Sequence, residues 1–309
     1  MKKIGLALGE GSARGFAHIG VLKTFEKYDV PIDYLAGSSV GALIAAFYAS
    51  GINANDLEKL ALTTNVKKLL DFTFPKEGVL KGDSIELLIR KLLQNKNFED
   101  LKIPLAIVTV DLKTGNKIVI KEGDLAKAIR ASISVSGVFV PVRMKKMILV
   151  DGGIIDPVPV SVVKEMGAEV VVGVQLGSYE MDMKKRKKNV KKFEDVFNET
   201  FLKKEAKEIE IHFKRKHKKL APFLQLASGL IDVRNFTGFN IFKFINKSYS
   251  ITMNELANKN LKEDYVNFVI KPNVYNIGPL DFEKVRDAIK EGEKAAESMI
   301  KKIDLSAIS

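Results

Sequence analysis

Residues 3–50 read KIGLALGEGSARGFAHIGVLKTFEKYDVPIDYLAGSSVGALIAAFYAS, and this stretch contains the same kind of unit twice. Residues 3–8 are a short apolar run that ends in glycines, and the helix-like residues 14–28 follow, which predicts a strand, a tight turn and a helix. Residues 32–36 predict a second short strand, and good helix formers fill residues 42–50 after it. The chain therefore begins as an α/β protein.

The remaining residues continue this alternation. Near-continuous apolar strands that alternate with helices predict a largely parallel or mixed α/β sheet. We expect one domain over residues 1–309, with a catalytic framework at 1–178, a basic and aromatic helical insertion or cap at 179–262, and a return to the core at 263–309. The further predicted helices cover residues 55–63, 83–94, 125–132 and 282–303, and the further predicted strands cover residues 105–110, 117–120, 147–150, 169–175 and 266–271.

The composition limits the chemistry that the chain can perform. With 46% hydrophobic and 28% charged residues, it is typical of a soluble globular protein. No apolar run approaches the roughly 20 residues of a spanning helix, and glycines interrupt the start before a signal-peptide core could form, so we expect a cytoplasmic protein. The absence of cysteine excludes disulfides, thiolate metal sites and a cysteine nucleophile. The net charge of +12 favours an anionic partner.

The segment AGSSVGA at residues 36–42 contains G-x-S-x-G between a predicted strand and a predicted helix. A serine at such a turn has its hydroxyl at the helix N-terminus, and the flanking glycines permit strained dihedral angles. The segment predicts a nucleophile elbow around Ser39, although an ordinary glycine-serine turn has the same composition. The elbow residues are Gly37, Ser38, Ser39, Val40 and Gly41.

A second glycine-rich loop, GEGSARG at residues 9–15, also lies between a strand and a helix. Its backbone N–H groups can converge on an anion, which suits the oxyanion of an acyl-transfer reaction. A nucleotide-binding loop does not fit, because G-x-x-x-x-G-K-[ST] is missing and Arg14 occupies the third glycine position of G-x-G-x-x-G. The candidate oxyanion residues are Gly9, Gly11, Ser12, Ala13, Arg14 and Gly15.

Asp151 follows the apolar strand at 147–150 and precedes Gly152 and Gly153. Strand ends of this kind hold the ligand sites of open α/β sheets. A serine hydroxyl needs a base to become a nucleophile, and the ordinary base is a histidine that a carboxylate orients. Asp151 is therefore a candidate either for the base itself or for the carboxylate partner of a histidine.

Three histidines bear on this choice. His18 lies in the predicted helix after the glycine-rich loop and is expected to pack or bond locally, whereas His212 and His217 lie among lysines and arginines that suit a solvated face. We therefore expect a Ser-Asp dyad in which Asp151 takes the proton of Ser39 directly. A Ser-Asp-His triad with His212 or His217 is the alternative.

Four motifs, at residues 9–22, 37–43, 128–142 and 151–160, occur in the order of the patatin-like phospholipase family and at suitable intervals. The chain therefore resembles this family, particularly its bacterial members. The resemblance covers the framework of residues 1–178 and implies a three-layer α/β/α fold with a mixed, mainly parallel sheet. It also implies a Ser-Asp dyad, no metal or cofactor, and hydrolysis of acyl esters in phospholipids or lysophospholipids. The motifs are GEGSARGFAHIGVL at residues 9–22, GSSVGAL at 37–43, AIRASISVSGVFVPV at 128–142 and DGGIIDPVPV at 151–160.

Carried over position by position, Ser39 matches the nucleophile of the family and Asp151 its base. Gly11, Arg14 and Gly15 match the oxyanion loop. The departures are Glu10 and Ser12, where many members have glycine, and Val135-Ser136, where Ile-Pro is frequent. A carboxylate at Glu10 would oppose negative charge at an oxyanion site unless its side chain points to solvent.

The insertion concentrates the positive charge, because residues 179–220 contain fifteen basic against eight acidic residues. Residues 184–192 and 214–219 predict a surface for anionic lipid headgroups, at about 1 kcal/mol per basic residue. No nucleic-acid partner is expected, since no recognisable nucleic-acid-binding motif accompanies these residues. The aromatic and apolar residues that follow suit either the acyl boundary of a membrane or an ordinary core. They are Phe236, Phe239, Ile241, Phe242, Phe244 and Ile245.

The sequence thus predicts a serine acyl-hydrolase of lipid esters, of the phospholipase A or lysophospholipase type. Glu10 and the basic insertion leave open a protein of another class, a catalytically silent lipid-binding or regulatory module.

Overall fold

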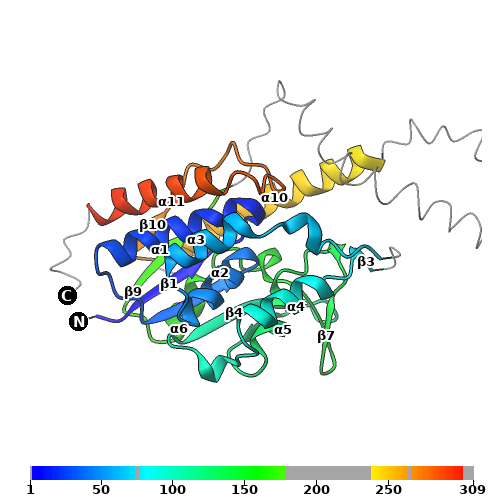
Figure 1. Ribbon diagram of the computed structural model, residues 1–309, viewed down its shortest axis with the longest axis horizontal. Helices are drawn as coiled ribbons and strands as arrows, with labels where there is room; N and C mark the ends of the chain where they lie inside the picture. The colour runs from blue at the N-terminus through cyan, green and yellow to red at the C-terminus, as the bar shows by residue number, and fades with distance from the viewer. Residues whose placement is uncertain (1, 74–76, 178–237, 264–265, 302–309) are drawn as a thin grey trace, which may run out of the picture. The chain divides into compact units, whose positions relative to one another are not determined.

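The computed structural model describes residues 2–73, 77–177, 238–263 and 266–301 (Figure 1). The chain forms two compact units, residues 1–179 with 252–309 and residues 180–251. The first unit contains an eight-stranded sheet and every residue predicted for the elbow, the glycine-rich loop and the Asp151 motif.

The sheet is mixed and mainly parallel. Its strand order is β10-β9-β1-β2-β4-β8-β7, with β5 also paired to β4. Neighbouring strands from β10 to β4 are parallel, whereas β5 and β8 run antiparallel to β4, and β7 runs antiparallel to β8. The strands are β1 (Ile4–Leu8), β2 (Tyr34–Ser38), β4 (Leu105–Asp111), β5 (Lys117–Ile120), β7 (Val142–Met144), β8 (Met147–Asp151), β9 (Val170–Val174) and β10 (Phe268–Ile270), and a separate pair joins β3 (Gly78–Leu80) to β6 (Gly137–Phe139).

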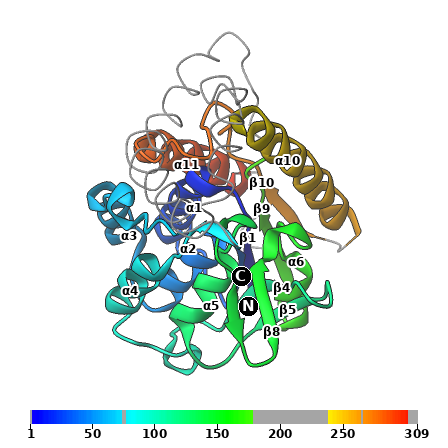
Figure 2. The ribbon, with the colours of Figure 1, turned by 90° about the vertical axis from the view of Figure 1, so that its right-hand side faces the viewer.

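Helices cover both faces of the sheet (Figure 2). One face carries α1 (Ala17–Lys27), α2 (Val40–Ala49), α3 (Ala54–Thr63), α4 (Asp83–Leu92), α5 (Leu125–Ser132) and α11 (Val285–Ile300). The other carries α6 (Val160–Glu165) and the part of α10 (Gly238–Glu263) that begins at residue 252. These layers confirm the predicted three-layer α/β/α fold.

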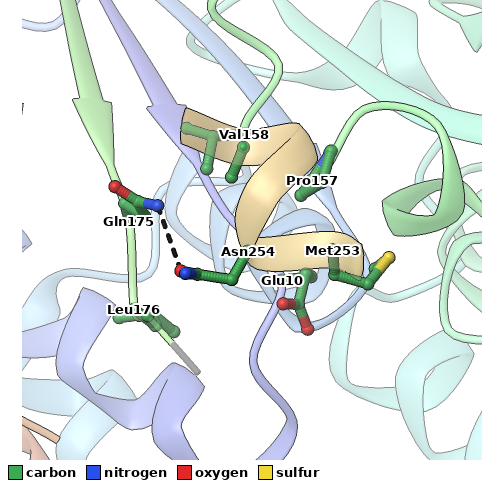
Figure 3. A pocket seen from close by; sticks show the side chains of 9 residues that line it. Glu10, Pro157, Val158, Gln175, Leu176, Met253 and Asn254 are labelled. Carbon is green, nitrogen blue, oxygen red and sulfur yellow. Dashed lines mark hydrogen bonds between the residues drawn. The ribbon is translucent and has the colours of Figure 1, made fainter. Parts of the chain in front are cut away.

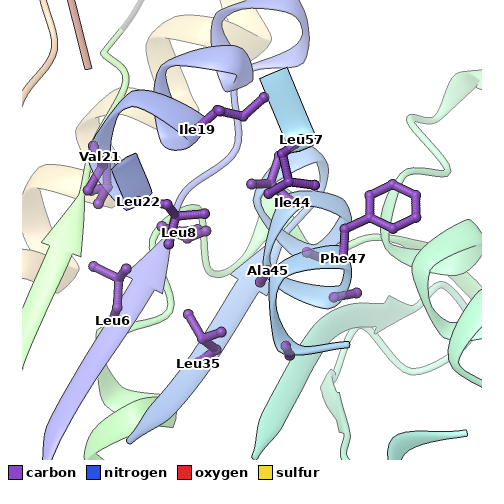
Figure 4. Packing of buried hydrophobic residues seen from close by; sticks show 14 of the residues in the cluster. Leu6, Leu8, Ile19, Val21, Leu22, Leu35, Ile44, Ala45, Phe47 and Leu57 are labelled. Carbon is purple, nitrogen blue, oxygen red and sulfur yellow. The ribbon is translucent and has the colours of Figure 1, made fainter. Parts of the chain in front are cut away.

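Side chains alternate between the two faces, as the period of a strand requires. In β1, Leu6 and Leu8 pack into the larger core beneath α1 and α2, whereas Ala7 belongs to the smaller core beneath α6 and α10 (Figure 4). Both cores are almost free of water contact. The uninterrupted apolar runs of β1 and β4 follow from this burial on both sides.

Several short elements were not predicted. The three-residue strands β3, β6 and β7 are too short to show a period of two, and the six-residue α6 follows Pro157 and Pro159, which hide its helical pattern. The segment predicted as a helix over residues 14–28 begins instead as a 3-10 helix, η1 (Ser12–Phe16), before α1. The boundaries of the insertion at 179–262 stay a prediction, and its described residues lie in α10.

The register of three adjacent strands brings Asp151 level with the end of β2. Ser38, the last residue of β2, pairs with Val108 of β4, and on the other side of β4 the neighbouring Thr109 pairs with Asp151. β8 is antiparallel, so Asp151 does not extend beyond the carboxyl edge of the parallel strands. β4 is longer than β2 and continues past the end of β2, so Asp151 can pair with β4 at Thr109, one residue beyond the partner of Ser38.

Candidate active site

Ser39 makes the turn between β2 and α2 by itself. Its dihedral angles, φ 55° and ψ −127°, lie outside the regions that residues other than glycine ordinarily adopt. The sequence predicted a turn over residues 37–41, but β2 runs to Ser38 and α2 begins at Val40. The side chain of Ser39 therefore lies at the N-terminal end of α2, where the helix dipole favours negative charge.

The two glycines of the elbow are sterically required. A Cβ atom on Gly41 would lie 2.1 Å from the carbonyl oxygen of Leu8, and one on Gly37 would lie 2.4 Å from the backbone nitrogen of Ala42. Both obstacles are backbone atoms, which cannot move aside cheaply. The spacing G-x-S-x-G thus follows from the close packing of α2 against the ends of β1 and β2.

The Ser39 side chain lies close enough to the Asp151 carboxyl group to lower its pKa by hydrogen bonding. Asp151 is 2% exposed, and its Oδ1 also accepts the Gly153 N–H at 2.8 Å. The pKa of Asp151 is raised from 3.8 to about 7. Burial is the main cause, and the neighbouring Glu10 carboxyl adds to it, whereas hydrogen bonding by Ser39 and by the Gly153 N–H opposes it. This carboxyl group can therefore change protonation state near neutral pH.

The glycines after Asp151 allow the chain to turn within the core. A Cβ atom on Gly152 would lie 2.3 Å from the carbonyl oxygen of Val108. A Cβ atom on Gly153 would lie 2.6 Å from the terminal methyl of Met253 and 3.1 Å from Asp151 Oδ1. Gly152 thus lets the turn pack against β4, and Gly153 leaves the carboxylate accessible to a backbone donor.

Most amides of the glycine-rich loop already have acceptors. Gly9 N–H donates to Val174 O at 3.1 Å, Ala13 N–H to Pro279 O at 3.3 Å, and Arg14 N–H to Gly11 O at 3.1 Å. Gly15 lies within η1. Among the described residues, no hydrogen-bond acceptor is found for the N–H groups of Gly11 and Ser12. Within the described part of the chain, these two amides are therefore the candidates for binding an anion.

Arg14 shapes the loop from within. It is 5% exposed, its Nε donates to Gly11 O at 3.2 Å, and a second guanidinium nitrogen donates to Gly177 O. Burial lowers the pKa of Arg14, and the nearby Glu10 carboxyl counteracts this shift. The guanidinium thus fixes the carbonyl of Gly11, whose own N–H has no acceptor among the residues that the structure describes.

A carboxylate at Glu10 leaves an oxyanion site undisturbed only if its side chain points to solvent. The Glu10 side chain does not meet this condition. It is partly buried and lines a small pocket with Met253 and Asn254 of α10 (Figure 3). Burial raises the pKa of the Glu10 carboxyl, and Arg14 lowers it. Gln175, on the opposite wall of the pocket, donates to Asn254 Oδ1 at 3.4 Å and to Asn258 Oδ1 at 2.9 Å.

His18 has a local structural role, as expected. It is fully buried, and its Nε2 donates to the carbonyl oxygen of Gly9 at 2.8 Å. Burial lowers its pKa to about 4, so the ring is neutral at pH 7. The ring therefore stabilises the start of the glycine-rich loop. His212 and His217 lie outside the described residues.

One serine that contacts the elbow has no signature in the sequence. Ser132, the last residue of α5, is fully buried, and its hydroxyl accepts the Ser39 N–H at 2.9 Å. The residue lies within the motif at 128–142, but no spacing rule relates it to Ser39. Only the pairing of α5 with β4 and the elbow reveals the contact.

The predicted membrane surface falls largely beyond what can be described. Residues 184–192, residues 214–219 and Phe236 lie outside the described residues. The other named aromatic and apolar positions belong to the first turns of α10. Within the described part of the chain, no helix combines the length and the apolar character that a membrane crossing requires.

The chain is similar to several known proteins. A sequence model of the family described as Patatin-like phospholipase matches residues 6–164. Patatin-like phospholipase domain-containing protein 6 of Mus musculus is 36% identical over 183 residues, 57% of this chain and 14% of that protein. An uncharacterised NTE family protein of Mycobacterium tuberculosis is 35% identical over 181 residues, 58% of this chain and 50% of that protein.

The chain thus spans half or less of these curated relatives. Among solved structures, the crystal structure of VipD from Legionella pneumophila is similar with a TM-score of 0.49 and 14% identity, over 97% of this chain and 67% of that one.

Proposed function

The chain belongs to the patatin-like phospholipase family, and from this premise we propose that it is a serine acyl-hydrolase of lipid esters with a Ser39–Asp151 dyad. The observation that carries the proposal is the proximity of the Ser39 side chain to the buried Asp151 carboxyl group, whose pKa it lowers by hydrogen bonding. The strained backbone of Ser39 supports it, because strain of this kind is concentrated at functional sites.

In the first step, Ser39 Oγ attacks the acyl carbonyl while its proton passes to the carboxylate of Asp151. The carbonyl oxygen becomes an oxyanion, and the N–H groups of Gly11 and Ser12 donate to it. Each such donor is worth about 3 kcal/mol in the transition state. Asp151 then returns the proton to the departing alkoxide, which leaves as an alcohol, and Ser39 remains acylated.

In the second step, Asp151 takes a proton from water, and the resulting hydroxide attacks the acyl-Ser39 carbonyl. The same two amides hold the second oxyanion. As the intermediate collapses, the proton passes from Asp151 to Ser39 Oγ and the carboxylic acid is released. The two steps balance as one ester and one water consumed, with one acid and one alcohol formed.

We infer a lipid acyl ester, either a phospholipid or a lysophospholipid, as the substrate. The family and the names of its relatives support this class. We also propose that the protein is cytoplasmic and that residues 184–192 and 214–219 bind an anionic membrane surface. Binding to vesicles with and without phosphatidylserine, at two salt concentrations, tests this contact.

The proposed reaction is tested with p-nitrophenyl butyrate and the Ser39→Ala variant. We expect wild-type turnover and a loss on the order of 10³-fold or more in the variant. Equal turnover in both proteins would refute the dyad. Mass spectrometry of a mixed lipid extract incubated with each protein then identifies the lipid from the products that only the wild type releases.

Two alternatives give different outcomes in the same assay. A silent lipid-binding module, which the partly buried Glu10 carboxyl beside Asp151 favours, shows no turnover that depends on Ser39. A triad that uses His212 or His217 predicts that joint substitution of both histidines abolishes turnover. Our proposal predicts near wild-type turnover for that double variant.

A further inference from the structure

One short segment at the end of α5 contacts both members of the proposed dyad. The Ser132 hydroxyl accepts the Ser39 N–H at 2.9 Å and donates to the carbonyl oxygen of Val108 at 2.7 Å. Two residues later, the carbonyl oxygen of Ser134 accepts the Asp151 N–H at 3.0 Å. The segment therefore joins the elbow, the central strand β4 and the end of β8.

The contact to Ser39 bears directly on its backbone conformation. The direction of the Ser39 N–H bond fixes the plane of the peptide before it, and thereby the φ angle of 55°. A non-glycine residue keeps such a conformation only when its surroundings impose it. Because Ser132 is fully buried, water has no room to replace its hydroxyl as the acceptor.

The same hydroxyl sets the elbow relative to Asp151. It donates to Val108 of β4, and the next residue of that strand, Thr109, pairs with Asp151. Ser132 is thus hydrogen-bonded to Ser39, in the turn after β2, and to β4 next to the residue that pairs with Asp151 of β8. A change at Ser132 alters the distance between the Ser39 hydroxyl and the Asp151 carboxylate.

A buried arginine anchors the segment from the other side. Arg130 is 2% exposed, and its guanidinium donates to Ser134 Oγ at 2.6 Å, to Gly82 O at 3.1 Å and to Val140 O at 2.9 Å. Ser134 Oγ in turn donates to the Arg130 carbonyl oxygen at 2.8 Å. These bonds tie the end of α5 to the segments before α4 and after β6.

We propose that residues 130–134 position the nucleophile against its base, and that the Ser132 hydroxyl is the group that positions Ser39. The proposal rests on the proposed function, because positioning matters only if Ser39 and Asp151 react. Ser132 is a positioning residue that acts through the Ser39 backbone and touches no substrate.

The test compares Ser132→Ala with a matched control, Ser50→Ala. Ser50 is a buried serine at the other end of α2, and its hydroxyl donates to Phe47 O at 2.6 Å. For each variant, kcat and KM are measured with p-nitrophenyl butyrate, and the rate of labelling by a fluorophosphonate is measured separately. Circular dichroism and thermal unfolding report whether each variant is folded.

We expect Ser132→Ala to lower kcat and the labelling rate in parallel by about 10- to 100-fold, because the buried Ser39 N–H loses its acceptor. KM should change by less than about twofold, since no substrate contact is lost. Ser50→Ala should keep both rates near wild type. Equal kcat and labelling rates in Ser132→Ala and wild type would overturn the proposal.

If Ser132→Ala does not fold, Ser132→Cys replaces the hydroxyl with a thiol, which is a weaker acceptor. A reduced kcat at unchanged KM supports the proposal, and a wild-type kcat overturns it. Ser39→Ala, measured in parallel, separates the two hypotheses. Full activity in Ser39→Ala refutes the proposed function, whereas inactive Ser39→Ala together with fully active Ser132 variants refutes only the positioning role.

Discussion

The Ser39 side chain lies beside Asp151, whose carboxyl group is 2% exposed and has its pKa raised by burial to about 7. Buried carboxyl groups of this kind resist ionisation, and an ionised one accepts a proton readily. The proposed direct deprotonation of Ser39 by Asp151 rests on this proximity and on the raised proton affinity of the carboxyl group.

The first prediction concerns the pH dependence of hydrolysis. Because Asp151 must be ionised to accept the serine proton, kcat/KM for p-nitrophenyl butyrate should rise with pH and reach half of its plateau near pH 7. An Asp151→Asn variant should be slow at every pH. A profile that is already flat from pH 5 upward would show that the base is another group with an ordinary carboxyl pKa.

The second prediction concerns Glu10, whose carboxyl raises the pKa of Asp151. Replacement by the neutral amide in Glu10→Gln removes this repulsion, so the pKa of Asp151 should fall. The midpoint of the kcat/KM profile should then move toward lower pH, with Lys2→Gln as a control for a charge change at an exposed residue before β1. A midpoint that stays in place or moves to higher pH contradicts the electrostatic assignment.

The third prediction concerns stability. The pKa of Asp151 is higher in the folded than in the unfolded chain, so folded molecules bind more protons between about pH 4 and 7 and lose stability as pH rises. At pH 8, the free energy of unfolding from urea titrations should therefore be a few kcal/mol higher for Asp151→Asn than for wild type. This difference should vanish toward pH 4. A variant less stable than wild type at pH 8 would be the opposite result.

His18 changes the pH dependence of folding stability in the opposite direction to Asp151. Its pKa of about 4 lies below the unfolded value of 6.5, so the unfolded chain binds more protons between these values and stability falls as pH decreases. In Asp151→Asn this slope is no longer offset. Urea unfolding of that variant should show stability increasing from pH 4 to 6.5 more steeply than in wild type.

The fourth prediction concerns the glycine spacing of the elbow. Gly41→Ala places a methyl group against the Leu8 carbonyl and should destabilise the fold by about 1–3 kcal/mol or more, with loss of activity. Gly123→Ala is the control, because that site has φ +80° but open space around it, and only conformational strain of about 1 kcal/mol is expected. Similar thermal shifts for both variants would contradict the steric argument.

Much of the fold follows from local sequence. The strands at residues 4–8 and 170–174 and the first four residues of the strand at 105–111 are apolar on both faces because helices cover both sides, and this pattern is visible without coordinates. Short elements such as β3 and α6 are fixed by tertiary contacts instead. Their few residues contain too little periodic signal to be read in isolation.

The site was predictable to a similar degree. The elbow and the Asp-Gly-Gly turn are local patterns, so Ser39 and Asp151 could be named as candidates, and their side chains lie near each other in the structure. Which amides of the glycine-rich loop are free depends on partners such as Val174 and Pro279, which are far away in the sequence. The contact of Ser132 with Ser39 likewise depends on the packing of α5 and has no local signature.

The most direct test of the dyad is fluorophosphonate labelling followed by peptide mass spectrometry of wild type, Ser39→Ala and Asp151→Asn. We expect wild type to carry the label on Ser39 and Ser39→Ala to remain unlabelled. Asp151→Asn should react at least about 100-fold more slowly than wild type. A label on a different serine, or labelling of Asp151→Asn at the wild-type rate, would contradict the assignment of Ser39 as nucleophile and Asp151 as its base.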